Sequence, residues 1–486
     1  MPTPLSQLPL SNAFTQLGTE FGAPTSPEPL TNPKLVAWDE ATANRLGITA
    51  DANSALNYFS GAAPLPGSAP LAMVYSGHQF GQFAGQLGDG RGLLLGDLIN
   101  QNGNWDLHLK GAGRTPYSRF GDGRAVLRSC IREYLASIAL NGLGIPTSHA
   151  LCVLVGDEPV ARERLEPRAS LVRVAQTHVR FGSFEHFFYR QQNAQLTQLA
   201  EHVIHRHLPA AQGQPDRYLQ LFTHAVHTTA TLIAQWQAVG FAHGVMNTDN
   251  MSILGETFDY GPYGFMETYD PGFICNHSDH QGRYAFEQQP QIGFWNLQAL
   301  AHSLSPLIDA TELGAELRRY PQLLTDRYAL EMRQKFGLSD ARPEDRQLNA
   351  DWLGLLHRAK LDYSQSFRAL ANLNAASQEE MLLKQFTAAD QRAQAEHWLS
   401  AYLQRRSSDP QPSAQRQALM LAKNPEYVLR NYLAQAAIEA AEAGDYEPTA
   451  RLADLLRNPG TAIAGAENFA QPAPEWAQHV TVSCSS

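Results

Sequence analysis

Lysine is scarce in this sequence, and cysteine is scarcer still. Only six of the 37 basic residues are lysine, and the 486-residue chain has four cysteines. Four cysteines in this length argue against a disulfide framework and indicate a reducing compartment. Between Lys34 and Lys335 the sequence has one lysine, Lys110, while arginine carries most of the positive charge. Because a lysine ammonium is a compact charge that suits a phosphate, Lys110 is a candidate functional residue.

Long hydrophobic runs and an excess of positive charge are also missing. No apolar run reaches the roughly 18 residues that a membrane-spanning helix needs, and residues 1–30 lack the basic and apolar regions of a secretory signal. The net charge of −10 argues against nucleic-acid binding. With 43 % hydrophobic and 17 % charged residues, the composition is typical of a globular protein with a packed core. We therefore expect a cytoplasmic protein that binds neither membranes nor nucleic acids.

The chain is long enough for two or three domains. Residues 1–60 are rich in Pro, Asn, Ser and Thr, and we expect them to form an extended segment that wraps the core. A Gly-rich, strand-forming part over residues 61–185 follows, and then a helical part over residues 186–470. Residues 471–486 form a tail that contains Cys484. No pattern in the sequence indicates an oligomeric state.

The most informative stretch runs from His243 to Asn250 and on to Asp259. A polar turn ends at Asn250, a short apolar run follows, and Asp259 precedes an aromatic residue and a glycine. Protein kinases use this layout, in an H-R-D-x-x-x-x-N loop and a D-F-G turn, to hold Mg²⁺ with Asn and Asp oxygens. The sequence predicts Asn250 and Asp259 as metal ligands, but Val245 occupies the position of the kinase base and accepts no proton. The alternative is an ordinary helix–loop–strand whose polar residues face solvent.

A Gly-rich segment precedes Lys110. Gly88, Gly90 and Arg91 lie in a loop that opens onto an apolar run. Because Gly lets backbone N–H groups approach an anion, the loop is a candidate cover for phosphates, or alternatively an ordinary hairpin. After an Asn-Gly turn signal, residues 105–110 alternate with period two, which predicts a paired strand that ends at Lys110. A solvent-facing lysine is the alternative.

Three further charged residues are candidates for the same site. The apolar stripe over residues 127–138 predicts a helix, and Glu133 lies beside this stripe. There it can pair with Lys110, as in the kinase Lys–Glu pair, or alternatively with a neighbouring arginine on the surface. Arg173 and Arg180 lie among apolar residues in an extended segment. Because an unpaired buried charge is costly, each arginine needs an anionic partner, either a phosphate or a carboxylate.

Cys275, His277 and His280 lie close together after the predicted metal turn. They offer three ligands for zinc but no clear fourth, and a Cys–His nucleophile pair is the other interpretation. The second interpretation predicts a thiol enzyme that works without ATP.

These stretches together resemble the selenoprotein O family, from about residue 73 to the tail. The motifs that carry the resemblance are Gly88-Asp89-Gly90-Arg91, Leu109-Lys110-Gly111, Phe120-Gly121-Asp122-Gly123-Arg124, Arg132-Glu133-Tyr134-Leu135, Arg180-Phe181-Gly182, Asn247-Thr248-Asp249-Asn250-Met251 and Asp259-Tyr260-Gly261. The resemblance implies an α+β, protein-kinase-like two-lobed fold with a β-rich N-lobe, a mainly helical C-lobe and an N-terminal extension. It also implies a protein adenylyltransferase, which transfers AMP from ATP to Ser, Thr or Tyr hydroxyls of protein substrates and releases pyrophosphate.

The resemblance implies roles for individual residues as well. The nucleotide-binding residues are Gly88, Gly90, Arg91, Lys110, Asp122, Gly123, Arg173 and Arg180, the ligands of Mg²⁺ or Mn²⁺ are Asn250 and Asp259, and the proton acceptor is Asp249. ATP is expected in an orientation flipped relative to kinases. Since Asp249 adjoins a metal ligand, the alternative role for it is to bind the metal through water. A kinase-type phosphotransferase and a non-catalytic nucleotide-binding scaffold are the alternative functions.

The cysteines allow one hypothesis about regulation. Cys275 follows the predicted metal turn, and Cys484 is the third residue from the end. A disulfide between them would tie the tail to the active-site region and make activity redox-dependent. Two unrelated thiols are the alternative.

Overall fold

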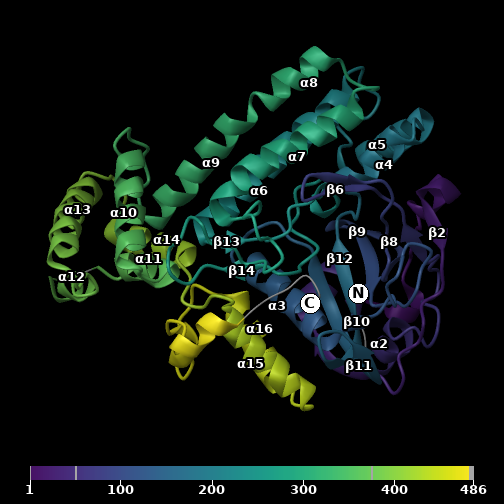
Figure 1. The fold of residues 1–486 in the computed structure, drawn as a ribbon, viewed down its shortest axis with the longest axis horizontal. Helices are drawn as coiled ribbons and strands as arrows, with labels where there is room; N and C mark the ends of the chain where they lie inside the picture. Colours follow the sequence, from purple (N-terminus) through teal and green to yellow (C-terminus); the bar gives the residue numbers. More distant parts are fainter. Residues whose placement is uncertain (1, 50–51, 374–375, 481–486) are drawn as a thin grey trace.

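The computed structural model describes residues 2–49, 52–373 and 376–480. The chain up to residue 175 is rich in strands, and the elements that follow are mostly helices (Figure 1). This mixed structure, with a sheet-rich part before a helical part, agrees with the sequence-based expectation.

The central element is an antiparallel sheet. Its strands follow the order β2 (Gly22–Pro24), β5 (Leu71–Met73), β8 (Gly92–Asn100), β9 (Gly103–Lys110), β12 (Leu165–Ala175), β11 (His149–Ala161) and β3 (Lys34–Trp38), with β10 (Ala125–Val126) paired to β12. Strands β8 and β9 form the predicted hairpin, in which Lys110 pairs with Gly92. The Gly-rich loop before β8 and the end of β9 therefore lie side by side.

The two faces of β9 carry different side chains. Trp105, Leu107 and Leu109 enter an apolar core on one face, while His108 and Lys110 line a cleft on the other. This is the period-two alternation expected of a strand. Lys110 is only 5 % exposed, so the alternative of a solvent-facing lysine is wrong.

Helix α3 (Leu127–Gly142) covers the cleft-side face of the sheet near β11 and β12. Its apolar residues, such as Ile131 and Leu135, are fully buried in the largest core of the protein. The helix is buried on nearly all sides, and Glu133 is 1 % exposed. A carboxylate so placed needs a partner inside the protein.

Residues 1–60 contribute more than an extended segment. They supply β2 and β3, the two edge strands of the main sheet, and helices α1 (Glu40–Leu46) and α2 (Ala52–Phe59). Leu46 and Phe59 from these helices pack in the same core as the apolar face of β9. The described part of the chain before β8 also contains two small strand pairs outside the main sheet: β1 (Thr3–Pro4) with β4 (Ile48–Thr49), and β6 (Gly77–Gln79) with β7 (Gln82–Ala84).

The helical part begins with α4 (Phe181–Tyr189), α5 (Asn193–His207) and α6 (Arg217–Val239), which share a second core. The remaining helices are α7 (Gln289–Leu304), α8 (Ala310–Leu317), α9 (Tyr320–Lys335), α10 (Asp345–Ala359), α11 (Tyr363–Ala371), α12 (Ala376–Leu383), α13 (Ala389–Ser407), α14 (Ser413–Lys423), α15 (Asn431–Glu442) and α16 (Glu447–Arg457). Helices α15 and α16 return to pack beside α3, and α10 to α13 project away from the sheet (Figure 1). None of the described helices is long and apolar enough to cross a membrane.

Two short paired strands lie at the two ends of the segment that contains the predicted metal ligands. Gly240, with φ +71°, ends α6 in the left-handed conformation that favours glycine. Strand β13 (Phe241–Ala242) then pairs with β14 (Gly264–Phe265). Asn250 and Asp259 therefore belong to one closed loop, which approaches the sheet.

Candidate active site

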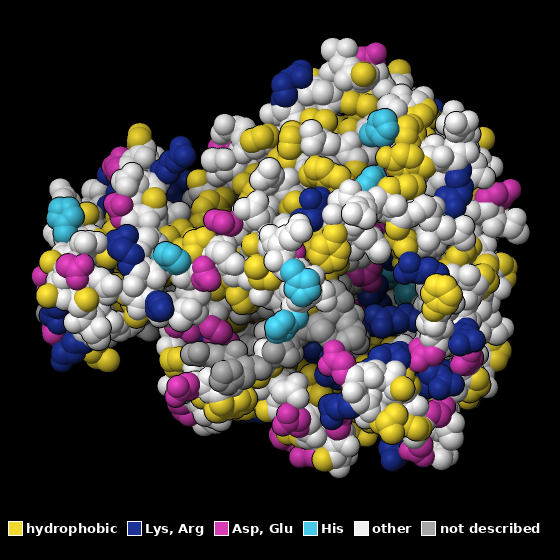
Figure 2. Space-filling model, in the orientation of Figure 1, with side chains coloured by type: hydrophobic (Ala, Val, Ile, Leu, Met, Phe, Trp, Pro, Cys, Tyr) yellow, Lys and Arg dark blue, Asp and Glu magenta, His cyan; other side chains and the backbone are white. Residues whose placement is uncertain are grey.

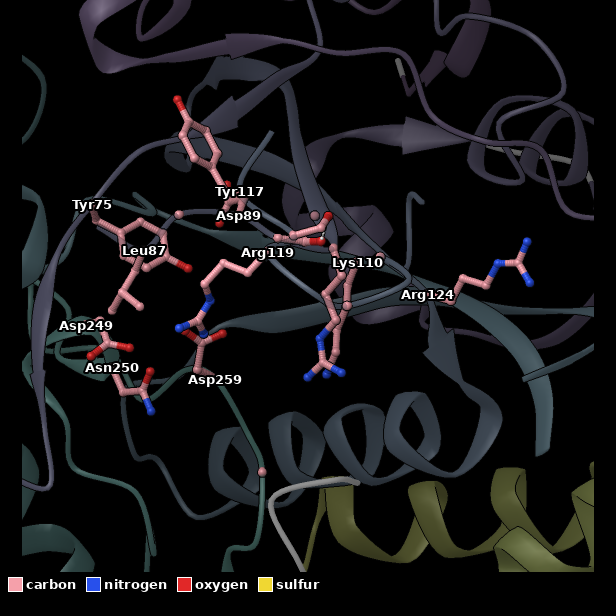
Figure 3. Close-up of a pocket in the computed structure, with 18 of the residues that line it drawn as sticks. Tyr75, Leu87, Asp89, Lys110, Tyr117, Arg119, Arg124, Asp249, Asn250 and Asp259 are labelled. Atoms are coloured by element: carbon pink, nitrogen blue, oxygen red, sulfur yellow. Dashed lines mark hydrogen bonds between the residues drawn. The ribbon is translucent and has the colours of Figure 1, made fainter. Parts of the chain in front are cut away.

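A cleft of about 880 Å³ gathers most of the predicted site residues. Figure 2 shows a hollow edged by Lys and Arg side chains, and Figure 3 shows Asp249, Asn250 and Asp259 near one another at one end of the cleft. The predicted residues that line it are Gly88, Gly90, Arg91, Lys110, Asp122, Gly123, Arg173, Asp249, Asn250 and Asp259. Glu133 and Arg180 lie behind this lining and bond to it. Lys110 and Asp259 therefore face the same cavity.

Five charged side chains form a connected series of ion pairs at the cleft. Lys110 Nζ lies 2.6 Å from Glu133 Oε2, and Arg173 Nε lies 2.6 Å from Glu133 Oε1. Arg173 also donates to Asp259 Oδ1 at 2.7 Å, and Arg180 donates to Asp259 Oδ2 at 2.6 Å. Three cations share two carboxylates, so one positive charge is in excess. Both arginines thus have carboxylate partners, and the net positive charge of this series is suited to a further anion such as a phosphate.

Burial and ion pairing act in opposite directions on these groups. Burial alone raises the pKa of Glu133, but Arg173 and Lys110 outweigh it and lower the pKa to about 2. Burial likewise opposes ionisation of Asp259, while Arg173 and Arg180 hold its pKa far below its usual range. Both carboxyl groups are therefore ionised at neutral pH.

Asp249 has a different environment, although it lines the same cleft. It is 6 % exposed, and burial raises its pKa to about 7 against the opposing effects of Gln79 and Arg180. Its Oδ2 accepts a hydrogen bond from Gln79 Nε2 at 3.1 Å. Its Oδ1 is buried and has no hydrogen-bond partner among the described residues. An unpartnered carboxylate oxygen at a cleft is suited to accept a proton or to bind a metal.

The backbone around Asp259 is held in an unusual conformation. Asp259 has φ +60°, which is rare for a residue with a side chain and is found preferentially at functional sites. His243 Nε2 donates to the carbonyl oxygen of Phe258 at 3.0 Å, and the hydroxyl groups of Tyr260 and Thr147 bond to each other. These contacts on both sides fix the direction of the Asp259 carboxylate.

The oxygen atoms at this end of the cleft are of the chemical kind that hard divalent cations prefer. Asn250 Nδ2 donates to the carbonyl oxygen of Val245 at 3.0 Å, so its Oδ1 is the atom left for a ligand. Each Asp259 oxygen accepts a bond from an arginine and keeps a second lone pair. Together with the unpartnered Oδ1 of Asp249, this is the type of donor set that Mg²⁺ and Mn²⁺ prefer.

Two glycines of the predicted nucleotide loops occupy positions that exclude larger residues. Gly88 has φ +144°, and a Cβ there would lie 2.5 Å from the ring of Tyr117. Gly123 has φ +71°, and a Cβ there would lie 2.1 Å from the carbonyl oxygen of Gly113. Arg91, between these loops and β8, is exposed at the mouth of the cleft. Both loops that line the cleft are therefore packed too closely against their neighbours to accept a side chain at these two positions.

Asp122 is tied to a residue that the sequence analysis missed. Arg162, in the turn between β11 and β12, donates to both carboxylate oxygens of Asp122 at 2.8 and 2.9 Å. Hydrogen bonds from Arg162 are the largest influence on the pKa of Asp122, which falls to about 2. This bidentate pair fastens the loop around Gly123 to the main sheet.

Other cleft residues also escaped the sequence analysis. His108 Nε2 lies 3.0 Å from Asp89 Oδ2, and both side chains are buried beside the Gly-rich loop. Asp89 lies between Gly88 and Gly90, two predicted nucleotide-binding residues, so its position in the sequence could have identified it as a residue of the cleft. No local pattern in the sequence indicates that Gln79 belongs to the cleft, because its partner Asp249 is 170 positions away.

The structure does not assemble a zinc site from Cys275, His277 and His280. Cys275 is buried, with its Sγ donating to the carbonyl oxygen of Ala242 at 3.5 Å, whereas both histidines are exposed. Within residues 2–49, 52–373 and 376–480, no group of three or more His, Cys, Asp or Glu side chains is placed to hold a metal. Cys484, the other half of the hypothetical disulfide, lies outside the described residues.

Comparisons with a family profile and with individual proteins indicate the same family. The sequence profile of the family described as "Protein adenylyltransferase SelO" matches residues 4–457. A protein of Vibrio vulnificus named "Protein nucleotidyltransferase YdiU" is 49 % identical over 490 residues, with 99 % of each chain covered. A protein of the same name from Azotobacter vinelandii is 48 % identical, with 99 % of each chain covered. Another, from Klebsiella pneumoniae, is 50 % identical, with 96 % of this chain and 97 % of the relative covered. The chain with the cleft described above is thus a member of the SelO family of protein adenylyltransferases.

Proposed function

We propose that this protein is a two-lobed, kinase-like enzyme that transfers AMP from ATP to Ser, Thr or Tyr hydroxyls of other proteins. The observation that carries the proposal is the single cleft in which Lys110, Arg173, Asp249, Asn250 and Asp259 meet. Its membership of a family described as protein adenylyltransferases supports nucleotidyl transfer to protein. In this proposal the main sheet and α3 form the N-lobe, and the helices from α4 onward form the C-lobe.

The distribution of charge supports an inward orientation of the phosphates. Lys110, Arg173 and Arg180 are 5 %, 4 % and 2 % exposed, so the permanent positive charge is deep in the protein. The β- and γ-phosphates of ATP are therefore expected near these cations, with the α-phosphate toward Asp249. This orientation is flipped relative to protein kinases, which transfer the γ-phosphate.

The proposed reaction is an in-line displacement at the α-phosphorus. The Asp249 carboxylate accepts the proton of the acceptor hydroxyl, and the hydroxyl oxygen forms a bond to the α-phosphorus. The bond from that phosphorus to the oxygen bridging to the β-phosphate breaks, and pyrophosphate leaves with the electron pair. Lys110, Arg173 and Arg180 hold the leaving group, which carries the growing negative charge. Mg²⁺ or Mn²⁺, held by Asn250 and Asp259, would supply further positive charge to the phosphate oxygens.

Labelled ATP tests the proposal. The protein is incubated with Mg²⁺ or Mn²⁺, a mixture of soluble proteins, and ATP labelled on either the α- or the γ-phosphate. We expect protein-bound label from the α position alone, and its loss in Asp259→Asn but not in the surface variant Asp326→Asn. Label from the γ position alone would identify a phosphotransferase. ATP binding without transfer of either label would identify a non-catalytic scaffold.

A further inference from the structure

The β6–β7 hairpin is fastened directly to the loop that carries Asp249. The backbone N–H of His78 donates to Thr248 Oγ1 at 2.7 Å, and Gln79 donates to Asp249 at 3.1 Å. Gly77 lies so close to Asp249 that a Cβ would stand 2.5 Å from Oδ1. The hairpin therefore forms the wall of the cleft beside the proposed proton acceptor.

The turn of this hairpin places an aromatic residue at the mouth of the cleft. Phe80 and Gly81 have φ +51° and +81°, the left-handed values of a tight two-residue hairpin turn. Glycine or asparagine usually takes such positions, yet Phe80 is there, lines the cleft and is 40 % exposed. Its N–H donates to Asn247 Oδ1 at 3.2 Å and to the Tyr284 hydroxyl at 3.0 Å. Strained residues of this type are concentrated at functional sites.

The other face of the hairpin carries an exposed aromatic patch. The ring of Phe83 lies 4.1 Å from that of Tyr189 at the end of α4, and His78 lies 5.2 Å from the rings of both Phe83 and Trp295. Phe83 and Tyr189 are 39 % and 42 % exposed. Figure 2 shows hydrophobic and His side chains over the region of β6, α4 and α7. Contiguous apolar surface of this type marks interaction sites.

Several large exposed apolar side chains lie at the cleft or on the adjoining hairpin and helix. Nine are found in the described part of the chain, of which Phe80, Phe83 and Tyr189 belong to the hairpin and its support. A fourth, Phe120, lines the cleft within the nucleotide loop and is fully exposed. In the described residues β7 pairs only with β6, so its second edge is open to an added strand. Both the apolar surface and the open edge therefore belong to the hairpin that bonds to Asp249 through Gln79.

We propose that the β6–β7 hairpin, with Tyr189, is the docking surface for the acceptor protein. The occupant is an extended segment that carries apolar or aromatic side chains next to the modified hydroxyl. Along a strand, successive side chains point to opposite faces, so one residue faces Gln79 and the cleft while its neighbours face Phe83 and Tyr189. This inference rests on the proposed AMP transfer and adds the class of acceptor sequence that the site selects.

Synthetic peptides test the docking surface. One set has a central Ser, Thr or Tyr flanked by Phe, and a matched set has Ala in place of Phe; transfer is followed with α-labelled ATP. We expect the wild-type protein to prefer the Phe-flanked peptides. The double variant Phe83→Ser, Tyr189→Ser should raise KM for them by about tenfold, the size of a typical interface anchor. The dissociation constant of ATP, measured by calorimetry, should not change, which shows that the variant is folded.

The control is Ile99→Ser, Met381→Ser, which removes two apolar side chains that are even more exposed, 58 % and 67 %, and that lie outside the β6–β7 hairpin and α4. It should leave the KM for peptides unchanged. Equal labelling of both peptide sets by the wild-type protein, or an unchanged KM in the hairpin variant, would overturn the docking proposal alone. If the wild-type protein binds ATP but labels no peptide and no protein, the proposed function itself fails and the docking surface fails with it.

Discussion

Glu133 is the carboxylate whose removal should disturb this protein most clearly. It accepts bonds from Lys110 and Arg173 at 2.6 Å each, and it is 1 % exposed. Glu133→Gln keeps the shape of the side chain but removes its charge, and leaves two buried cations with less compensation. Breaking a buried ion pair from one side costs about 3–5 kcal/mol in the free energy of unfolding.

The pKa of Glu133 gives a second, separate estimate of its contribution to the free energy of unfolding. Its value falls from 4.5 in the unfolded chain to about 2 in the folded protein. At about 1.36 kcal/mol for each pKa unit, ionised Glu133 contributes about 3 kcal/mol at neutral pH. Because the folded pKa is lowered, this contribution is complete above pH 4.5 and is lost as the pH falls toward 2.

Urea unfolding followed by tryptophan fluorescence, at several pH values between 7 and 3, measures the effect. We expect Glu133→Gln to lower the free energy of unfolding by about 3 kcal/mol at pH 7, and the difference from the wild type to shrink below pH 4.5. The control is Glu396→Gln, whose exposed partner is Arg392 at 3.1 Å; its cost should be below about 1 kcal/mol. A loss at Glu133 as small as that of the control, or one independent of pH, would refute the reasoning.

Three further predictions concern buried groups. Burial raises the pKa of Glu256 to about 8, so its contribution to stability is present below pH 4.5 and is lost as the pH rises through 8. Urea unfolding should therefore show that the free energy of unfolding of Glu256→Gln, relative to the wild type, is about 3 kcal/mol higher at pH 7 than at pH 4.5. Burial lowers the pKa of Lys335 to about 7, so protonation of this side chain favours the unfolded chain as the pH falls from 10.5 toward 7. Thermal unfolding should therefore show that Lys335→Met stabilises the protein more at pH 7 than at pH 10. An equal effect at both pH values would contradict this. Gly123→Ala should weaken ATP binding in calorimetry, because its Cβ meets Gly113, whereas Gly213→Ala, with a similar φ of +75° and open space around it, should not.

Much of the site could be predicted because its residues stand in short patterns. The alternation of residues 105–110 predicts which side of β9 carries Lys110, and the helical stripe of α3 places Glu133 beside its apolar face, where pairing with Lys110 was one of two alternatives. The spacing between Asn250 and Asp259 predicts that both belong to one loop. Local periodicity and turn chemistry decide each of these features, so a single sequence is sufficient.

The N-terminal segment shows where such reasoning fails. Its composition resembles an extended segment, yet β2 and β3 complete both edges of the main sheet. Edge strands are short, and their pairing partners are distant in sequence, so local composition carries little information about them. The helices α1 and α2 are likewise stabilised by the core that they cover.

The sequence by itself determined the family, the order of strand-rich and helical parts, and the types of residue that meet phosphate and metal. Only the tertiary structure decided that Arg162 clamps Asp122, that Gln79 bonds to Asp249, and that Asp249 keeps one oxygen unpartnered. The physical reason is that these contacts join side chains 40 to 170 positions apart, whose distance is set by the packing of whole elements. Burial raises the pKa of both Asp249 and Glu133, but only Glu133 has two cations paired to it, and that difference is also a property of the packed molecule.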